Sequence, residues 1–359
     1  MKIIDVQSKE DKKRYIDFVY KLYRKDENFC DMNLLFVKNY LFKKDDHAKR
    51  SMVLPIIIEE GDIKLVGMFI STNDSPQIKL SFLEFLPNSQ VYIKELVDYG
   101  KKLMVSLDKQ EIIVGINGHV SYGLGILAPN SNRDFEFNSN YNKEYYTREL
   151  EEVMPVTKKA FSYQYTVNHS LSLIKEGIIE RVEKEYTYRC LNKKHFKREM
   201  LIFGNLADQA LRQTPYYSEK TPLEMYQLMK KMRFIMKKED IVFAMKDGKE
   251  VGFIFTHPDY AKLFDRPKVN YIKFYLRFLR KRTHHLIYNV IGILPEYQKT
   301  GLGIGLIHYT IRLRQKEYTQ GVSSFILEDN FLSTKMCKGL SIGDHKEYRI
   351  YEIKRENNV

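Results

Sequence analysis

Two stretches, one in each half of the chain, share the same order of apolar runs around a polar turn. In the first, residues 56–58 and 63–70 are mostly apolar, with Glu-Glu-Gly-Asp between them. In the second, the runs at 241–245 and 251–255 flank Lys-Asp-Gly-Lys-Glu. β-Branched and aromatic residues around a glycine-containing turn are typical of a β-hairpin. The sequence therefore predicts one hairpin in each half.

The elements around the two hairpins repeat as well. Helical periodicity precedes each hairpin, a helix and a short apolar strand follow it, and each half ends on a tyrosine-rich strand. We expect helices at 12–23, 31–42, 91–106, 195–212, 222–236 and 302–317, and further strands at 112–116, 161–165, 286–293, 324–327 and 348–352. This order predicts an α/β fold of two tandem domains, 1–170 and 171–359. Each would be a mixed, largely antiparallel sheet flanked by helices.

The run from Ile291 to Gly305 carries the strongest local signal. An apolar strand pattern is followed by Pro295, by a turn with glycines at 301 and 303, and by a helix pattern from residue 302. Glycines let the backbone point successive N–H groups at one anion, and a helix N-terminus adds unpaired donors. The run indicates a phosphate-binding loop, with an ordinary structural turn as the alternative. The Walker and dinucleotide loops fit worse, because the residues after Gly303 and the spacing of the third glycine differ from theirs.

The spacing Gln298-x-x-Gly301-x-Gly303 resembles the acyl-CoA-binding motif of the GNAT acetyltransferases, and the order of elements is also similar to theirs. Segments 120–127 and 141–146, and the tail from 330 to 352, resemble a bacterial group of uncharacterised tandem GNAT proteins. The resemblance implies an N-acyltransferase with acetyl-CoA or another acyl-CoA as cosubstrate. A small-molecule or peptide amine would attack the thioester directly, in a ternary complex.

The resemblance also implies which residues hold the cosubstrate. Ile291 and Ile293 would offer backbone hydrogen bonds to the pantetheine arm, and Asn330 would contact it, unless Asn330 caps a helix instead. The pyrophosphate would be surrounded by Gln298, Lys299, Thr300, Gly301, Leu302, Gly303 and Ile304. The matching segment of the first half, 85–92, has no glycine. We therefore expect the first domain to hold no CoA and either to shape the acceptor site or to be purely structural.

The chain departs from the GNAT pattern where many of these enzymes place a general-acid tyrosine. Cys337 stands there, seven residues after Asn330. Either the thiolate leaves unassisted or the site has lost efficient catalysis, and Cys337 could also be a small buried apolar residue. Candidates for the base that deprotonates the amine are Glu328, His285 (with its neighbour His284) and Tyr288. A surface carboxylate and a solvated loop are the alternatives for Glu328 and for the histidine pair.

Charge and cysteine content indicate the kind of ligand and the cellular compartment to expect. Among 359 residues, 59 lysines and arginines exceed 46 acids, so the net charge is +13 and an acidic ligand or surface is expected. Three widely separated cysteines form no metal-binding spacing and suit a reducing compartment. The N-terminus lacks the apolar core of a signal peptide, and no stretch approaches the roughly 20 apolar residues of a membrane span. We expect a cytoplasmic protein without a metal.

Part of the basic excess lies in the segment Lys262–His285, where aromatic residues interleave at helical spacing. A solvated amphipathic helix, a clamp for an acidic acceptor, an RNA contact and a membrane-surface foot all fit this pattern.

Two other functions compete with the acyltransferase. The tandem fold and the basic charge suit an aminoacyl-tRNA-dependent transferase of the Fem type, although those enzymes do not need a CoA loop. The missing tyrosine suits a non-catalytic ligand-binding or interaction protein on the GNAT fold.

Overall fold

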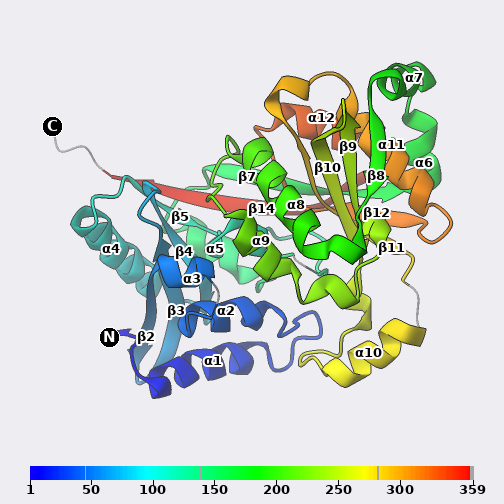
Figure 1. Cartoon of the computed structure of the whole chain (residues 1–359). Coiled ribbons are helices and arrows are strands. Elements are labelled where there is room, and N and C mark those ends of the chain that lie inside the picture. Colours follow the sequence, from blue (N-terminus) through cyan, green and yellow to red (C-terminus); the bar gives the residue numbers. More distant parts are fainter. Residues whose placement is uncertain (45, 138, 281–282, 356–359) are drawn as a thin grey trace. The chain divides into compact units, whose positions relative to one another are not determined.

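The computed structural model describes residues 1–44, 46–137, 139–280 and 283–355 (Figure 1). The chain divides into two compact units. Unit 1 comprises Met1–Ala160, Leu263–Lys281 and Lys346–Val359, and unit 2 comprises Phe161–Lys262 and Arg282–His345. The domains 1–170 and 171–359 are inferred from the repeated order of elements, and they stay a prediction. The compact units have different bounds, because segments from both halves of the sequence contribute to unit 1.

Unit 1 is built on a sheet with the strand order β1-β2-β3-β4-β5-β14, and β6 pairs with β14 on the side. Neighbours are antiparallel except β4 and β5, which are parallel. The strands are β1 (Lys2–Asp5), β2 (Met52–Glu60), β3 (Asp62–Ser71), β4 (Gln77–Phe85), β5 (Glu111–Val114), β6 (Ile126–Leu127) and β14 (Gly343–Lys354). The β2–β3 hairpin confirms the first predicted one.

Helices of unit 1 bury their apolar sides against this sheet. On α4 (Gln90–Ser106), Ile93, Leu96 and Val97 pack into a core with Phe69 and Leu80 of the strands. The other helices are α1 (Lys9–Tyr23), α2 (Asn33–Leu41), α3 (Asp46–Arg50), the 3₁₀ turn η1 (Val120–Tyr122), α5 (Tyr145–Glu151) and α10 (Tyr271–Arg280).

Residues 263–280 of the basic segment belong to unit 1, although the sequence places them within the second half. Asp31 holds it, because its Oδ1 accepts from the Val269 N–H at 2.9 Å and its own N–H donates to the Pro267 carbonyl at 2.9 Å. On α10, Phe274 is buried, whereas Ile272 and Leu279 are exposed. The expected amphipathic helix is present, and its partner stays a prediction.

Unit 2 has the strand order β7-β12-β11-β10-β9-β8, with β13 paired to β7. The strands are β7 (Lys158–Thr166), β8 (Thr187–Cys190), β9 (Ile241–Lys246), β10 (Lys249–Pro258), β11 (His285–Ile293), β12 (Gln320–Ser323) and β13 (Ile326–Leu327). β9 and β10 form the second predicted hairpin. β11 and β12 are parallel, whereas the pairs β7–β12, β10–β11, β9–β10 and β8–β9 are antiparallel.

Two helical layers cover the sheet of unit 2. Leu302, Leu306 and Ile311 of α11 share a core with Val242 and Ile254, and Phe203 of α8 packs edge-on against Phe253 in a second core. The helices are α6 (Val167–Leu173), α7 (Glu176–Glu185), α8 (Phe196–Leu211), α9 (Pro222–Met229), α11 (Leu302–Arg314) and α12 (Phe331–Leu340). Six 3₁₀ turns complete the described elements, η1 in unit 1 and η2 (Lys193–His195), η3 (Met232–Phe234), η4 (Lys238–Asp240), η5 (Tyr260–Leu263) and η6 (Pro295–Tyr297).

The expected α/β class and strand 286–293 are confirmed, but two expectations about strands are wrong. The strand after α11 is β12 at Gln320–Ser323, and residues 326–327 form β13 beside β7 instead. The tyrosine-rich strands also do not close the halves that contain them. β7 pairs with β12 in unit 2, whereas β14 pairs with β5 in unit 1. Among the described residues, no helix is long and apolar enough to cross a membrane.

Candidate cosubstrate cradle and fork

Strands β11 and β12 pair along only part of their length. The parallel register runs from His285–Gln320 to Tyr288–Ser323, and the Ser324 N–H donates to the Tyr288 carbonyl at 2.8 Å. β11 then continues to Ile293, paired with β10 on its other side, while the chain after β12 turns to β7 as β13. The two strands therefore part after Tyr288, and we call this place the fork of unit 2.

A β-bulge lies at the same point. Phe255 faces Val290 and Thr256 faces Tyr288, so Asn289 is the extra residue of β11. A bulge bends its strand and re-aims the groups beside it, and it is often found next to functional sites. The bend explains why β11 leaves β12 here.

Hydrogen bonds between residues close in sequence shape the loop between β11 and α11. The Gln298 side-chain Nε2 donates to the Ile293 carbonyl at 3.1 Å, and the Thr300 hydroxyl donates to the Tyr297 carbonyl at 2.9 Å. Lys299 has φ = 63° and the N-cap Gly301 has φ = 93°, both in the left-handed region. The Gln298 amide thus ties the loop to the end of β11.

The loop leads into the N-terminus of α11, where most of the first amides have no side-chain acceptor among the described residues. An α-helix leaves its first four N–H groups without intrahelical acceptors, here those of Gly301, Leu302, Gly303 and Ile304. Within the described chain, only the Leu302 N–H has a side-chain acceptor, the Thr300 hydroxyl at 3.4 Å. Gln298 and Lys299 are exposed. We call residues 298–304 the cradle.

The positive φ at Gly301 favours glycine, and side chains of α7 pack closely around it. A Cβ there would lie 3.3 Å from Val182 and 3.4 Å from the Arg181 guanidinium, both on α7. The sequence did not single out Arg181, because nothing local ties α7 to a loop more than a hundred residues later. A guanidinium beside a helix N-terminus increases the positive potential there.

The remaining predicted cosubstrate residues flank the fork. Ile291 and Ile293 are half-buried on the part of β11 that has left β12. Asn330 is the N-cap of α12, and its side chain accepts from the Ser333 N–H at 3.3 Å. The capping alternative for Asn330 is therefore confirmed, and its contact with pantetheine stays a prediction.

A cluster of hydroxyl and thiol groups lies beside the fork. The Tyr165 and Tyr288 rings meet edge to face with centroids 5.6 Å apart, and Tyr165 is hydrogen-bonded with Cys337. Burial raises the pKa of the Cys337 thiol to about 11 and raises the pKa of both tyrosines well above the usual value. Cys337 is therefore a neutral thiol at pH 7, and it is half-buried.

The three predicted bases lie at different places along the strands of unit 2. Tyr288 is at the fork, whereas His285 is at the start of β11 and Glu328 is exposed after β13. The roles of all three stay predictions. Tyr165 is the residue that the sequence reasoning missed, although the alternation Phe161-Ser-Tyr163-Gln-Tyr165 places these aromatic residues on one strand face.

The corresponding helix N-terminus of unit 1 has an acceptor of its own. The fully buried Glu149 carboxylate accepts from the N–H groups of Asn88 and Ser89, at 2.7 Å each, just before α4. A carboxylate there does what an external phosphate would do. That the first domain holds no CoA stays a prediction.

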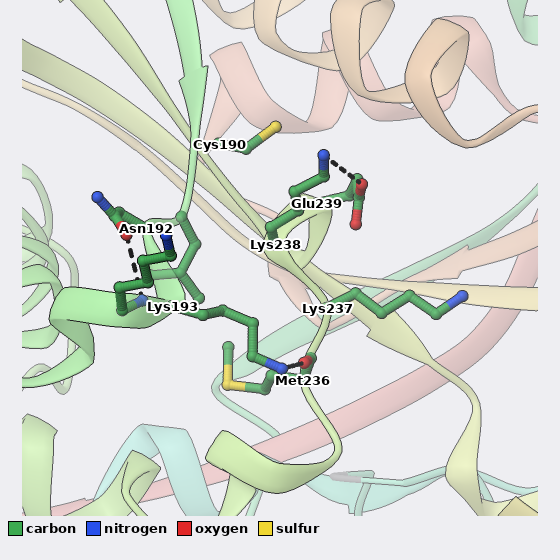
Figure 2. A pocket seen from close by; sticks show the side chains of 9 residues that line it. Cys190, Asn192, Lys193, Met236, Lys237, Lys238 and Glu239 are labelled. Carbon is green, nitrogen blue, oxygen red and sulfur yellow. Dashed lines mark hydrogen bonds and ion pairs between the residues drawn. The ribbon is translucent and has the colours of Figure 1, made fainter. Parts of the chain in front are cut away.

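A separate hollow of about 630 Å³ lies in unit 2 and includes Cys190, four lysines and Glu239 (Figure 2). Lys193 donates to the Met236 carbonyl, Lys237 pairs with Glu317, and Lys238 lies 3.8 Å from Glu239. Two of the four lysines, Lys237 and Lys238, thus have an acidic partner within the protein. None of the predicted cosubstrate residues lines the hollow. The described residues contain no group of three or more His, Cys, Asp and Glu side chains that could hold a metal ion.

Solved structures with the same fold include three informative ones. A tandem GNAT protein from the clavulanic acid biosynthesis pathway, without AcCoA, has a TM-score of 0.57 and 8% identity over 100% of this chain and 99% of its own. The GCN5-related glucosamine N-acetyltransferase region of a fungal multi-domain GH3 β-N-acetylglucosaminidase has a TM-score of 0.55 and 12% identity, over 98% of this chain and 38% of that one. A conserved protein of unknown function from Enterococcus faecalis V583, described as a probable N-acyltransferase, has a TM-score of 0.51 and 8% identity over 99% and 72%.

Comparisons of sequence alone find less. No model of a known protein family matches the chain. No curated protein matches it either. The structural neighbours therefore establish the tandem GNAT fold that the sequence predicted, and the chemistry has to be argued from the site.

Proposed function

We propose, for a chain with the tandem GNAT fold, that this protein is an acyl-CoA-dependent N-acyltransferase whose cosubstrate site is the cradle and fork of unit 2. The observation that carries the proposal is the N-terminus of α11, where a left-handed Gly301 begins a turn in which only the Leu302 N–H, among the first amides of the described helix, has a side-chain acceptor. That N-terminus follows directly on the strand that leaves its partner. A diphosphate at the amides and an extended arm along the free side of β11 would use both features at once.

Each predicted residue then has a physical task. The cradle amides and Arg181 would hold the diphosphate, and the backbone at Ile291 and Ile293 would bond the pantetheine arm as an added strand. Acetyl-CoA or another acyl-CoA supplies the thioester. The acceptor is an amine, which has to lose a proton during attack. Glu328 and His285 are the proposed bases.

Tyr288 fits a hydrogen-bond donor better than a base. Burial raises its pKa, so its hydroxyl keeps the proton at neutral pH. Its position at the end of the β11–β12 pairing suits donation to the oxygen or sulfur that gains charge during the reaction. Cys337 then need not act as a general acid. The leaving group is the thiol of CoA, and an ordinary thiol with a pKa near 8.5 is a tolerable leaving group.

The direct test is titration calorimetry of the full chain with acetyl-CoA, with CoA and with tRNA, followed by turnover against a panel of amines. We expect saturable binding of acetyl-CoA and CoA, no comparable heat with tRNA, and release of free thiol with at least one amine. Binding of charged tRNA without binding of CoA would favour the Fem-type transferase. Binding of CoA without turnover of any amine would favour a non-catalytic ligand-binding protein.

A further inference from the structure

Unit 1 has its own fork, and that fork contains a cavity. The parallel register of β4 and β5 ends at the pair Leu80–Val114, while β4 continues to Phe85. The cavity of about 50 Å³ is lined by Phe82, Leu83 and Glu84 of this free part of β4. A space of that size holds roughly three to five water molecules. It can equally hold one small organic ion.

Two sequence motifs with no role in the proposed reaction meet at this cavity. Tyr122, Gly125 and Ile126 come from the segment at 120–127, and Tyr141 and Asn142 come from the segment at 141–146. The last tyrosine of the second motif, Tyr146, donates a hydrogen bond to Glu84. Motifs separated in sequence thus share one location in unit 1.

The glycines of the first motif are needed for this arrangement. Gly123 has φ = 123°, and a Cβ on it would lie 1.8 Å from the Asn140 Oδ1. That oxygen accepts from Asn117, whose own Oδ1 accepts from the Phe82 N–H at 2.9 Å. The glycine therefore allows a polar chain that ties the cavity wall together.

Glu84 is the charged residue among those that line the cavity. Its Oε2 accepts from the hydroxyls of Tyr23, at 2.7 Å, and Tyr146, at 2.6 Å. Both interactions use the same oxygen, and no described residue donates to Oε1. The asparagine groups of the wall already bond one another and the backbone. The available polar group of the cavity is therefore one carboxylate oxygen.

The other walls are mostly aromatic or aliphatic. Five aromatic side chains contribute, those of Phe29, Phe36, Phe82, Tyr122 and Tyr141. Aromatic faces attract cations, and a buried carboxylate requires a positive partner to stay ionised. A small organic cation suits both the aromatic walls and the carboxylate. An apolar molecule suits only the walls, and an anion suits neither.

We propose that this cavity binds a small organic ammonium ion, held by the Glu84 carboxylate within the aromatic walls. The site is in unit 1 and uses no residue of the cradle. It takes either a free alkylammonium ion or the ammonium end of a larger amine.

The test uses the full chain without acyl-CoA and measures the melting temperature and calorimetric heat with ethylammonium and tetramethylammonium chloride. Sodium chloride at equal ionic strength is the salt control. We expect an ammonium-specific rise in melting temperature and saturable heat. Glu84→Gln should weaken the binding by about tenfold or more, as expected when a buried charge pair is lost. Glu152→Gln, an exposed change at the end of α5, should leave it unchanged.

A measurement on the unmodified protein keeps the test decisive if Glu84→Gln does not fold. Methyl protons of ¹³C-methylammonium should show intermolecular NOEs to the ring protons of Phe82 and Tyr122. Equal effects of ammonium and sodium salts, together with no NOE, would mean that the cavity holds water only and would overturn the proposal. Gly303→Val should lose acetyl-CoA binding and keep ethylammonium binding, so this site and the acyl-CoA site succeed or fail independently.

Discussion

The Glu149 carboxylate accepts a hydrogen bond from the Ser89 N–H at 2.7 Å, and its second oxygen does the same with the N–H of Asn88. An internal anion thus occupies the helix N-terminus of unit 1. The N-terminus of α11 in unit 2 carries no such carboxylate among the described residues. The helices α4 and α11 each follow a strand that pairs in parallel with the next strand, β4 and β11 respectively. The N-terminus of α4 is therefore an anion site filled by the protein's own carboxylate, whereas that of α11 is open to an external anion.

Removing this internal anion should destabilise unit 1 without creating a CoA site. Glu149→Ala leaves the buried Ser89 N–H and the part-buried Asn88 N–H without their acceptor and is expected to lower the free energy of unfolding by about 3 kcal/mol. Urea unfolding followed by circular dichroism measures this loss. The exposed Glu152→Ala on the same helix should change it by less than about 0.5 kcal/mol.

The number of acetyl-CoA molecules bound per chain should stay at one in Glu149→Ala, because segment 85–92 still has no glycine. A second equivalent of bound acetyl-CoA would contradict the view that unit 1 cannot hold it.

A side chain at Gly303 should block the cradle while the fold survives. Gly303 is the second residue of α11, and a Cβ there would lie 3.2 Å from the Met336 sulfur, on a flexible side chain, and 3.5 Å from the Ile293 Cδ1. Gly303→Val is expected to weaken acetyl-CoA binding at least about tenfold, since valine covers the amides that face the diphosphate. Gly177→Val is the matched control, because Gly177 is the second residue of α7 and has open space around it. Equal affinity in both variants, measured by calorimetry, would count against the cradle.

The sequence predicted the parts of this fold that depend on local patterns. The hairpins β2–β3 and β9–β10 follow alternating runs around glycine turns, and the loop after β11 has glycine at Gly301, where φ is positive. The strand after α11 was misplaced because residues 320–323, Gln-Gly-Val-Ser, have a weak apolar pattern and pair through neighbouring strands. Strand pairing decided that element, and local propensity did not.

Long-range partners could not be predicted for a similar reason. Glu149 meets Ser89, and Tyr23 meets Glu84, across about 60 residues of sequence. A carboxylate in an amphipathic helix reads as solvated unless the partner strand is known. The exchange of β7 and β14 between the units is likewise a matter of pairing, since both strands have the same tyrosine-rich pattern.

Tyr288 should affect the chemical step more than binding. Tyr288→Phe removes the hydroxyl and keeps the ring that packs on Tyr165 and over Gly321. We expect kcat to fall by about 10²-fold with little change in the KM for acetyl-CoA, as when a single hydrogen-bond donor to developing charge is lost. Tyr309→Phe, on α11 and stacked on Tyr188, is the control and should keep kcat. An unchanged kcat in Tyr288→Phe would assign the donor role elsewhere and leave His285 and Glu328 to be tested in the same assay.

Glu84 should make the stability of unit 1 fall as the pH rises. Burial raises its pKa from 4.5 to about 7. The titratable groups near it are Tyr15 and Tyr23 on α1, Tyr145 and Tyr146 on α5, and Lys143. Burial also raises the pKa of all four tyrosines, so they remain protonated in this range. Between pH 4.5 and 7 the folded state holds a proton that the unfolded chain has released. Folding is therefore favoured at the acid end, and about 3 kcal/mol is lost once the pH exceeds 7.

Glu84→Gln removes this titration, and the comparison with the unmodified protein isolates it from all other groups. From pH 4.5 to pH 8, the unmodified protein should lose up to about 3 kcal/mol of unfolding free energy relative to the variant. Urea unfolding at half-unit pH steps measures it. Saturating ethylammonium should flatten the same difference, because a bound cation favours the ionised carboxylate and offsets the cost of its burial. A difference that stays constant with pH would mean that Glu84 is already ionised or well solvated in the empty cavity.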